Sequence, residues 1–249
     1  MTLTREGIID AFRAALEPRA DVIALSEAGS AAFGALDEYS DIDLSIDGED
    51  GSEEAVWDAI EAMFRGLAPV AHRFDIPQPS WHGMSQRFYR LEGTSEWLML
   101  DLALRPTAKR GTFTERERHG DAIVYFDKDG ATIPLSLDRT RLAEDREKRL
   151  AAVRAATPLL ASLGRKEALR GRPLDAVAMY QSQLFRPLVD VLRSRYCPDR
   201  WDYGLRYLER DLPAQVYARL APLAFASDLD DLLAKAVEAE SWLADELTP

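Results

Sequence analysis

Alternation of apolar and polar positions is clearest in a short segment near residue 40. From Asp41 to Ile46 the two kinds of residue alternate strictly, which predicts a strand with one buried face. The other face of this strand carries Asp41 and Asp43. Upstream, the apolar run 22–25 stops before Gly29-Ser30, which predicts a strand that passes into a helix through a tight turn with outward N–H groups.

A second alternating segment lies between Glu96 and Arg105. Its leucines at positions 98, 100, 102 and 104 share one face, which is therefore expected to be core. Asp101 stands in the middle of the other face. Because a buried carboxylate without a partner is costly, Asp101 requires a cation or several hydrogen-bond donors nearby.

The remaining pattern predicts two regions of different class. The first contains predicted helices at 4–16, 30–36 and 52–67 and predicted strands at 21–26, 70–76, 86–91 and 122–126. Beyond residue 138 only helical spacing occurs, at 142–161, 173–195, 201–209, 213–223 and 228–247. We therefore expect an α+β domain at 1–136, with a mixed β-sheet and flanking helices, and an all-α helical bundle at 137–249.

The acidic strand face predicts a particular chemistry. Two carboxylates that share one face repel each other unless a positive group lies between them. A divalent cation is the usual solution, and Mg²⁺ normally takes one or two carboxylates together with substrate phosphates. The Gly29-Ser30 turn suits such phosphates, because glycine allows close approach to outward N–H groups. The pattern therefore predicts a site for phosphoryl or nucleotidyl transfer.

These residues resemble the signature of the nucleotidyltransferase superfamily, the DNA polymerase β-like one. That signature is Gly-Ser, a short spacer, and Asp-hydrophobic-Asp at the start of a strand, which Gly29-Ser30 and Asp41-Ile42-Asp43 match. The closest resemblance is to the antibiotic (aminoglycoside) adenylyltransferases with a C-terminal helical domain. It extends to three spacer residues, Gly34, Leu36 and Ser40. Many members carry an arginine just before the glycine that Gly34 matches, whereas this chain has Phe33.

The resemblance implies a metal-dependent nucleotidyltransferase. It would move a nucleoside monophosphate, AMP from ATP, onto a hydroxyl of a small molecule such as an aminoglycoside-like antibiotic, with two Mg²⁺ ions. The helical domain would bind the acceptor. The implied catalytic and metal-binding residues are Asp41, Asp43 and Asp101, and the implied nucleotide-binding residues are Gly29, Ser30 and Ser40. Asp75, at the end of a predicted strand, competes with Asp101 for the place of the third carboxylate.

Other functions of the same fold stay open. The chain could be a nucleotide-binding or partner-binding module without turnover, of the antitoxin type, although all three carboxylate positions are filled. It could also transfer AMP onto a protein side chain or an RNA end. The acceptor, the preferred base and the oligomeric state do not follow from the sequence.

A calcium loop is an alternative for the acidic segment after Asp43. Counted from Asp43, most EF-hand offsets are met by Ser45, Asp47, Gly48 and Glu54. However, an EF-hand requires an entering helix, whereas this segment alternates like a strand, and no second loop of the kind occurs. We therefore expect residues 47–51 to form a solvated turn.

Composition narrows the class of protein. The 249-residue chain has a formal net charge of -12, which argues against nonspecific nucleic-acid binding and suits a cationic substrate, although many cytosolic proteins are acidic. The single cysteine, Cys197, excludes an internal disulfide framework. Because the sequence has neither a membrane-spanning apolar run nor a signal-peptide pattern, we expect no membrane partner and a cytoplasmic location.

Several further residues could contribute to a site. The histidines lack the spacing of a zinc site and are expected on the surface or in packing roles: His72, His82 and His119. The segment 200–203, Arg-Trp-Asp-Tyr, either lines an acceptor pocket or anchors the core of the second domain. Arg87 and Arg105 are candidates for contact with a triphosphate.

Overall fold

The computed structural model describes residues 3–248 and divides into two compact units, Met1–Leu137 and Asp138–Pro249. The helices of the first unit are α1 (Arg5–Leu16), α2 (Gly29–Ala32), α3 (Glu53–Leu67) and α4 (Arg116–His119). Its strands are β1 (Val22–Glu27), β2 (Ile42–Gly48), β3 (Val70–Asp75), β4 (Ser85–Leu91), β5 (Leu100–Pro106) and β6 (Ile123–Asp127). The described strands form one mixed sheet in the order β3-β4-β5-β2-β1-β6.

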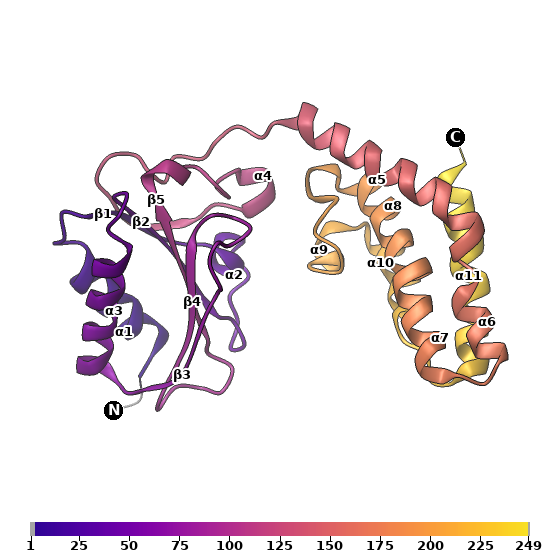
Figure 1. Ribbon diagram of the computed structural model, residues 1–249, viewed down its shortest axis with the longest axis horizontal. Helices are drawn as coiled ribbons and strands as arrows, with labels where there is room; N and C mark the ends of the chain where they lie inside the picture. Colours follow the sequence, from indigo (N-terminus) through magenta and orange to yellow (C-terminus); the bar gives the residue numbers. More distant parts are fainter. Residues whose placement is uncertain (1–2, 249) are drawn as a thin grey trace. The chain divides into compact units, whose positions relative to one another are not determined.

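The central strands β2 and β5 are parallel, and the other neighbours are antiparallel. Figure 1 shows α1 and α3 together on one side of this sheet and α2 and α4 on the other. Thr4 caps the N-terminus of helix α1, since its Oγ1 accepts a hydrogen bond from the Gly7 N–H, and the helix buries Ile8 and Phe12. Phe12 meets Phe64 of α3 edge-to-face, with ring centroids 5.7 Å apart.

The core of the first unit lies between this helix pair and the apolar faces of the strands. The even-numbered positions of β2 and β5 are almost completely buried there: Ile42, Leu44, Ile46, Leu100, Leu102 and Leu104. The alternation read from the sequence therefore holds in both strands. Since α1 and α3 cover the apolar face, the carboxylates at the odd-numbered positions lie on the opposite face of the sheet.

The second unit is all-helical. Its helices are α5 (Arg139–Leu160), α6 (Leu163–Leu169), α7 (Pro173–Tyr180), α8 (Arg186–Tyr196), α9 (Leu208–Asp211), α10 (Ala214–Leu220) and α11 (Leu229–Leu247). A π-helical stretch, Gln181–Phe185, joins α7 to α8. No strand occurs between residues 139 and 248, and the unit has its own apolar core. The predicted fold class, an α+β region followed by an all-α region, is confirmed.

Three predicted elements differ from the structure. Helix α2 ends at Ala32 instead of residue 36, because Phe33 leaves helical geometry and Gly34 has a φ of 62°. Strand β5 begins at Leu100 instead of residue 96. The predicted helix at 201–209 is mostly turns, because Gly204 and Tyr207 have left-handed φ values of 60° and 59°. The carbonyls of Gly204 and Arg206 accept hydrogen bonds from buried Arg193.

Candidate functional site

The two candidate acids on strands lie beside each other. In the parallel register of β2 and β5, Asp43 is the direct partner of Asp101, and the next pairs on the same face are Ser45 with Ala103 and Asp47 with Arg105. Asp43 and Asp101 are both half-buried. Asp101 Oδ1 accepts a hydrogen bond of 2.6 Å from Gln86 Nε2 on β4. Two acids 58 positions apart in the sequence therefore meet on the face that α1 and α3 leave uncovered.

Asp41 lies one step before β2, at the same end of the strand pair. The Ile42 N–H donates to the Met99 carbonyl at 2.9 Å, and the Met99 N–H donates to Asp41 Oδ1 at 3.3 Å. Asp41 is thus tied to the residue that precedes β5. Because side chains two positions apart share a strand face, Asp41 and Asp43 point to the same side.

The Gly29-Ser30 turn packs directly against Asp43. Gly29 has a φ of 59°, and a Cβ atom placed on it would lie 1.7 Å from Asp43 Oδ2. The Ala28 N–H donates to the Asp43 carbonyl at 2.9 Å, which fixes the turn to β2. Only glycine satisfies both the left-handed backbone and the close contact with the carboxylate. The two halves of the sequence motif therefore form one surface.

Negative side chains outnumber positive ones around Asp43. Burial, together with the negative charges of Asp101, Asp41 and Glu27, raises the pKa of Asp43 to about 6, while Arg5 acts in the opposite direction. Repulsion from the neighbouring carboxylates thus adds to the effect of burial on the pKa of Asp43. A cation placed among these acids would relieve that repulsion.

The carboxylates do not form a complete metal cage. Among residues 3–248, no three His, Cys, Asp or Glu side chains are arranged so that they could hold a metal ion by themselves. The donor set still fits a hard cation in its chemistry, because it consists of crowded carboxylate oxygens and includes an acid with a raised pKa. A metal ion here would need further ligands from outside the chain.

The two candidate serines differ in their surroundings. Ser30 lies in α2, and its carbonyl accepts from the Ala35 N–H at 3.0 Å. The Ser40 hydroxyl donates to Asp37 Oδ1 at 2.8 Å and accepts from the Asp37 N–H at 2.9 Å. Ser40 therefore shapes the loop that leads into Asp41.

A cavity of about 260 Å³ opens on the same sheet face, next to the Gly29-Ser30 turn. Its lining includes Ser26 and Ala28 of the β1 end, and Ser45 of β2. The segment 113–122 forms one wall and is attached to α2, because the Asp121 N–H donates to the Ala32 carbonyl at 2.9 Å. The cavity and the turn thus share a border.

Aromatic rings stand at the wall of this cavity. Phe113 has a φ of 61°, an uncommon backbone for a bulky residue, and its ring lies 5.4 Å from that of His119 and 5.8 Å from that of Trp81. Phe113 and His119 line the cavity, and Trp81 is 85% exposed. Strained backbone of this kind is often found at functional sites.

Other sequence candidates lie elsewhere. Asp75 is on the edge strand β3, where both its oxygens accept from Arg73 at 2.7 and 2.6 Å, so its pKa is lowered. Arg87 lies on the helix-covered face, 4.3 Å from the Trp57 ring of α3. Both residues are therefore separated from Asp43. Of the other histidines, His72 is exposed on β3, and His82 Nδ1 accepts from the Met84 N–H at 3.1 Å.

The calcium alternative is contradicted by the geometry. The segment that enters the acidic loop is strand β2, and not a helix. Asp47 is also not a solvated turn residue: it is buried, and its two oxygens accept from Arg105 at 2.6 and 2.8 Å. Arg105 lies at the floor of the cavity, where it makes this ion pair with Asp47 and also donates to the Thr112 carbonyl.

In the second unit, Arg200 of the 200–203 segment belongs to a buried ion-pair network. Arg200 donates to Asp211 Oδ1 at 2.6 Å, and Arg193 donates to Asp211 Oδ2 at 2.9 Å. Arg193 and Asp211 are buried, so this network holds the α8–α9 connection. Cys197 is half-buried, and burial raises the pKa of its thiol.

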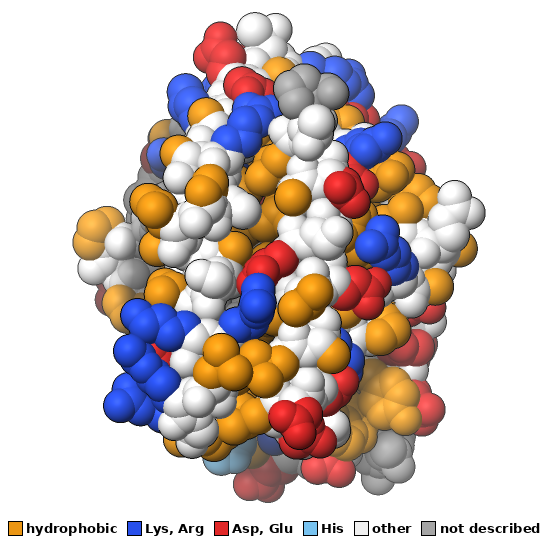
Figure 2. All heavy atoms as spheres, turned by 90° about the vertical axis from the view of Figure 1, so that its right-hand side faces the viewer, with side chains coloured by type: hydrophobic (Ala, Val, Ile, Leu, Met, Phe, Trp, Pro, Cys, Tyr) orange, Lys and Arg blue, Asp and Glu red, His pale blue; other side chains and the backbone are white. Residues whose placement is uncertain are grey.

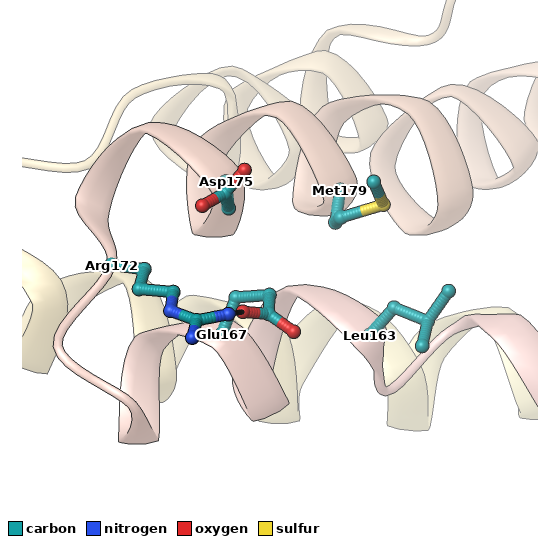
Figure 3. A pocket seen from close by; sticks show the side chains of 5 residues that line it. All are labelled: Leu163, Glu167, Arg172, Asp175 and Met179. Carbon is teal, nitrogen blue, oxygen red and sulfur yellow. Dashed lines mark hydrogen bonds and ion pairs between the residues drawn. The ribbon is translucent and has the colours of Figure 1, made fainter.

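The second unit also carries a shallow pocket of about 250 Å³ between α6 and α7. Figure 3 shows Leu163 and Glu167 of α6 facing Asp175 and Met179 of α7, with Arg172 bound to Glu167 at 3.2 Å. On the face of the molecule drawn in Figure 2, apolar, basic and acidic side chains of the described residues are interspersed, and no one kind covers it. This pocket combines acidic and apolar walls, but its one basic side chain already pairs with an acid.

Sequence reasoning missed residues that adjoin the acids. It assigned no role to Glu27 or to the cavity-wall loop that contains Phe113, and it predicted His119 only on the surface or in packing. Glu27 had a usable signal, since it is an ionisable residue at the end of an apolar run, directly before the Gly29-Ser30 turn. The loop residues of the cavity wall, such as Phe113 and Thr114, had none, because their segment has no periodicity.

Comparisons with known proteins add little to this geometry. No family model and no curated protein sequence matches the chain. Among solved structures, an aminoglycoside 6-adenyltransferase from Bacillus subtilis is similar at 13% identity, over 98% of this chain and 91% of that one, with a TM-score of 0.36. Between residues 3 and 248, no helix has the length and apolar character needed to cross a membrane.

Proposed function

We propose that the chain transfers a nucleoside monophosphate, AMP from ATP, onto a hydroxyl group of a small molecule. One observation carries the proposal: Asp43 is in register with Asp101 on parallel strands, and Gly29 packs against the Asp43 carboxylate. This places a phosphate-accommodating turn and a pair of crowded acids on one surface. Such a surface suits a triphosphate and its cations.

Asp41, Asp43 and Asp101 would hold Mg²⁺ together with the nucleotide. Because they do not form a complete cage, the phosphates would supply the missing ligands, as is usual for Mg²⁺. When bound, two such ions would neutralise the triphosphate and lower the pKa of the attacking hydroxyl. Asp101 would accept the proton of that hydroxyl as general base.

The chain's other residues would bind the nucleotide. Gly29 would let the backbone approach the phosphates closely, and the Ser30 hydroxyl and N–H would hold the β- or γ-phosphate. Ser40 would act through the loop it shapes. The adjoining cavity would receive the nucleoside, because it borders the turn and offers the aromatic edges of Phe113 and His119 beside several hydroxyls. The cavity volume of about 260 Å³ lies just below the roughly 300 Å³ at which small-molecule pockets begin, so the cavity would hold the nucleoside part of the nucleotide alone.

The acceptor would be a hydroxylated amine, of which aminoglycosides are one class. The net charge of -12 supports a cationic acceptor. The helical unit, which follows residue 137, would contribute to acceptor binding as the resemblance implies. Cytoplasmic localisation also remains part of the proposal.

The test is pyrophosphate release from ATP and Mg²⁺ in the presence of an acceptor panel, with nucleotide binding measured by calorimetry. Asp43→Asn and Asp101→Asn should each abolish turnover while the far-ultraviolet circular dichroism stays unchanged. Asp75→Asn is the matched control, because Asp75 is an acid on the edge strand of the same sheet, and it should retain wild-type turnover. Turnover that survives Asp101→Asn would remove Asp101 from the site.

A binding module without turnover would give a different result. Mg·ATP would bind to the wild type with an affinity that depends on Asp43, and no acceptor in the panel would yield pyrophosphate. Absence of both binding and turnover would refute nucleotide chemistry at this surface altogether.

A further inference from the structure

The first residue of α1 contacts both halves of the site. Arg5 Nη1 donates to the Asp41 carbonyl at 2.8 Å and to the Ser40 carbonyl at 3.3 Å, and Arg5 Nη2 donates to the Glu27 carboxylate. Glu27 is the last residue of β1, two positions before Gly29, whereas Ser40 and Asp41 directly precede β2. One guanidinium therefore joins the phosphate turn to the segment that carries the first acid.

The Glu27 end of this link is buried and fully partnered. Glu27 is 1% exposed, and its second oxygen accepts a hydrogen bond from the Tyr125 hydroxyl of β6. A buried carboxylate is costly unless it is paired and hydrogen-bonded. Glu27 therefore fixes the orientation of the guanidinium, with Tyr125 as a third member of the cluster.

The Arg5 end is fixed by the helix. Thr4 caps α1, and Ile8 and Phe12 anchor it in the core with no exposed surface. In contrast, the segment 34–39 between α2 and Asp41 is exposed throughout. Because that segment has no core contacts of its own, the position of the Asp41 backbone depends on groups that reach it from other elements.

We propose that Arg5 is a positioning residue for nucleotidyl transfer, an inference that rests on the function proposed above. It acts through the backbone of Ser40 and Asp41 and holds Asp41 at a fixed place relative to the Gly29-Ser30 turn. A planar guanidinium can reach two carbonyls and one carboxylate at once, whereas a lysine ammonium is a compact charge on a flexible stem. Arg5→Lys therefore preserves the charge beside Glu27 and loses the rigid fork that contacts Ser40, Asp41 and Glu27 at once.

The first readout is hydrogen exchange of the apo protein. Arg5→Lys should increase amide exchange at positions 34–42 roughly tenfold and leave α3 and β4 unchanged. Arg19→Lys is the matched control: Arg19 donates to both oxygens of Asp21 at 2.9 and 2.6 Å, just before the other end of β1. The control should leave exchange at 34–42 as in the wild type.

The second readout is steady-state kinetics with ATP and an accepted hydroxyl compound. Arg5→Lys should lower kcat about 100-fold, since small displacements of catalytic groups have effects of this size, while KM for ATP changes less than about threefold. Arg19→Lys should alter neither. A purely structural role of Arg5 would instead lower the melting temperature and leave kcat per folded molecule unchanged.

Each outcome decides the inference. Unchanged exchange at 34–42 in folded Arg5→Lys, or kinetics equal to those of Arg19→Lys, would overturn it. Should Arg5→Lys not fold, Tyr125→Phe removes one hydrogen bond of Glu27 without changing charge, and it should raise exchange at 34–42 roughly threefold. A wild type that neither binds Mg·ATP nor releases pyrophosphate refutes the proposed function, whereas the exchange experiment then still decides whether Arg5 holds Asp41.

Discussion

Replacing Asp43 by asparagine should stabilise the metal-free protein at neutral pH. The pKa of Asp43 is raised from 3.8 to about 6 in the folded chain, so the native state retains a proton that the unfolded state has lost. Below pH 3.8 both states are protonated and Asp43 has no effect. As the pH rises from about 4 to about 6, the unfolded chain loses this proton while the folded chain keeps it, so the stability of the native state falls. Above about pH 6 both states are ionised and the loss of stability is complete.

The size of the effect follows from the shift. A change from 3.8 to about 6 corresponds to about 3 kcal/mol at neutral pH, which is an upper limit because Asp43 is only partly buried. Asparagine has nearly the same shape and no charge, so Asp43→Asn should recover much of this free energy. For a protein of this size the corresponding rise in melting temperature is roughly 6–12 °C.

The assay is thermal unfolding in chelator between pH 4 and pH 8. The difference in melting temperature between Asp43→Asn and wild type should be near zero at pH 4 and should grow to a plateau by about pH 7. Asp75→Asn is a control of opposite sign, because Arg73 lowers the pKa of Asp75 and its ionised form therefore stabilises the native state. A difference for Asp43→Asn that does not depend on pH would refute the electrostatic account.

Three further results are expected. Gly29→Ala should abolish nucleotide binding measured by calorimetry, because the added methyl would lie 1.7 Å from Asp43 Oδ2 at a φ of 59°; binding equal to wild type would contradict the packing. Mg²⁺ titrated alone should bind weakly and should bind tightly only with ATP, since the acids form no cage by themselves; tight binding of Mg²⁺ alone would contradict this. Asp47→Asn should destabilise the fold by about 3–5 kcal/mol in chemical denaturation, because it leaves buried Arg105 without its counter-charge.

The sequence predicted the faces of the central strands better than their neighbours. Strict alternation was sufficient to place Asp43 and Asp101 opposite the apolar core, because a side-chain period of two permits only one buried face. It could not supply the register that makes them partners. That register depends on strand order, which is set by how α3, β3 and β4 pack.

The sequence failed where backbone groups bind side chains distant in sequence. The predicted helix at 201–209 is interrupted by left-handed backbone at Gly204 and Tyr207, and its carbonyls bind the distant Arg193. Arg5 gave no signal, since an arginine in the first turn of an amphipathic helix is ordinary on the surface. Asp47 was expected in a solvated turn, because nothing local indicated that Arg105 lies beside it.

The parallel pairing of β2 with β5 also bears on the order in which the site forms. The chain must complete α3, β3 and β4 before β5 can add to β2, because a parallel partner requires a long crossover. Closing so large a loop is slow compared with forming the β3–β4 hairpin. During synthesis, Gly29, Asp41 and Asp43 therefore emerge early, but the candidate site that they share with Asp101 stays incomplete until Asp101 has left the ribosome. The nucleotide of the proposed function should then bind only chains whose sheet is closed, and it would stabilise a late stage of folding.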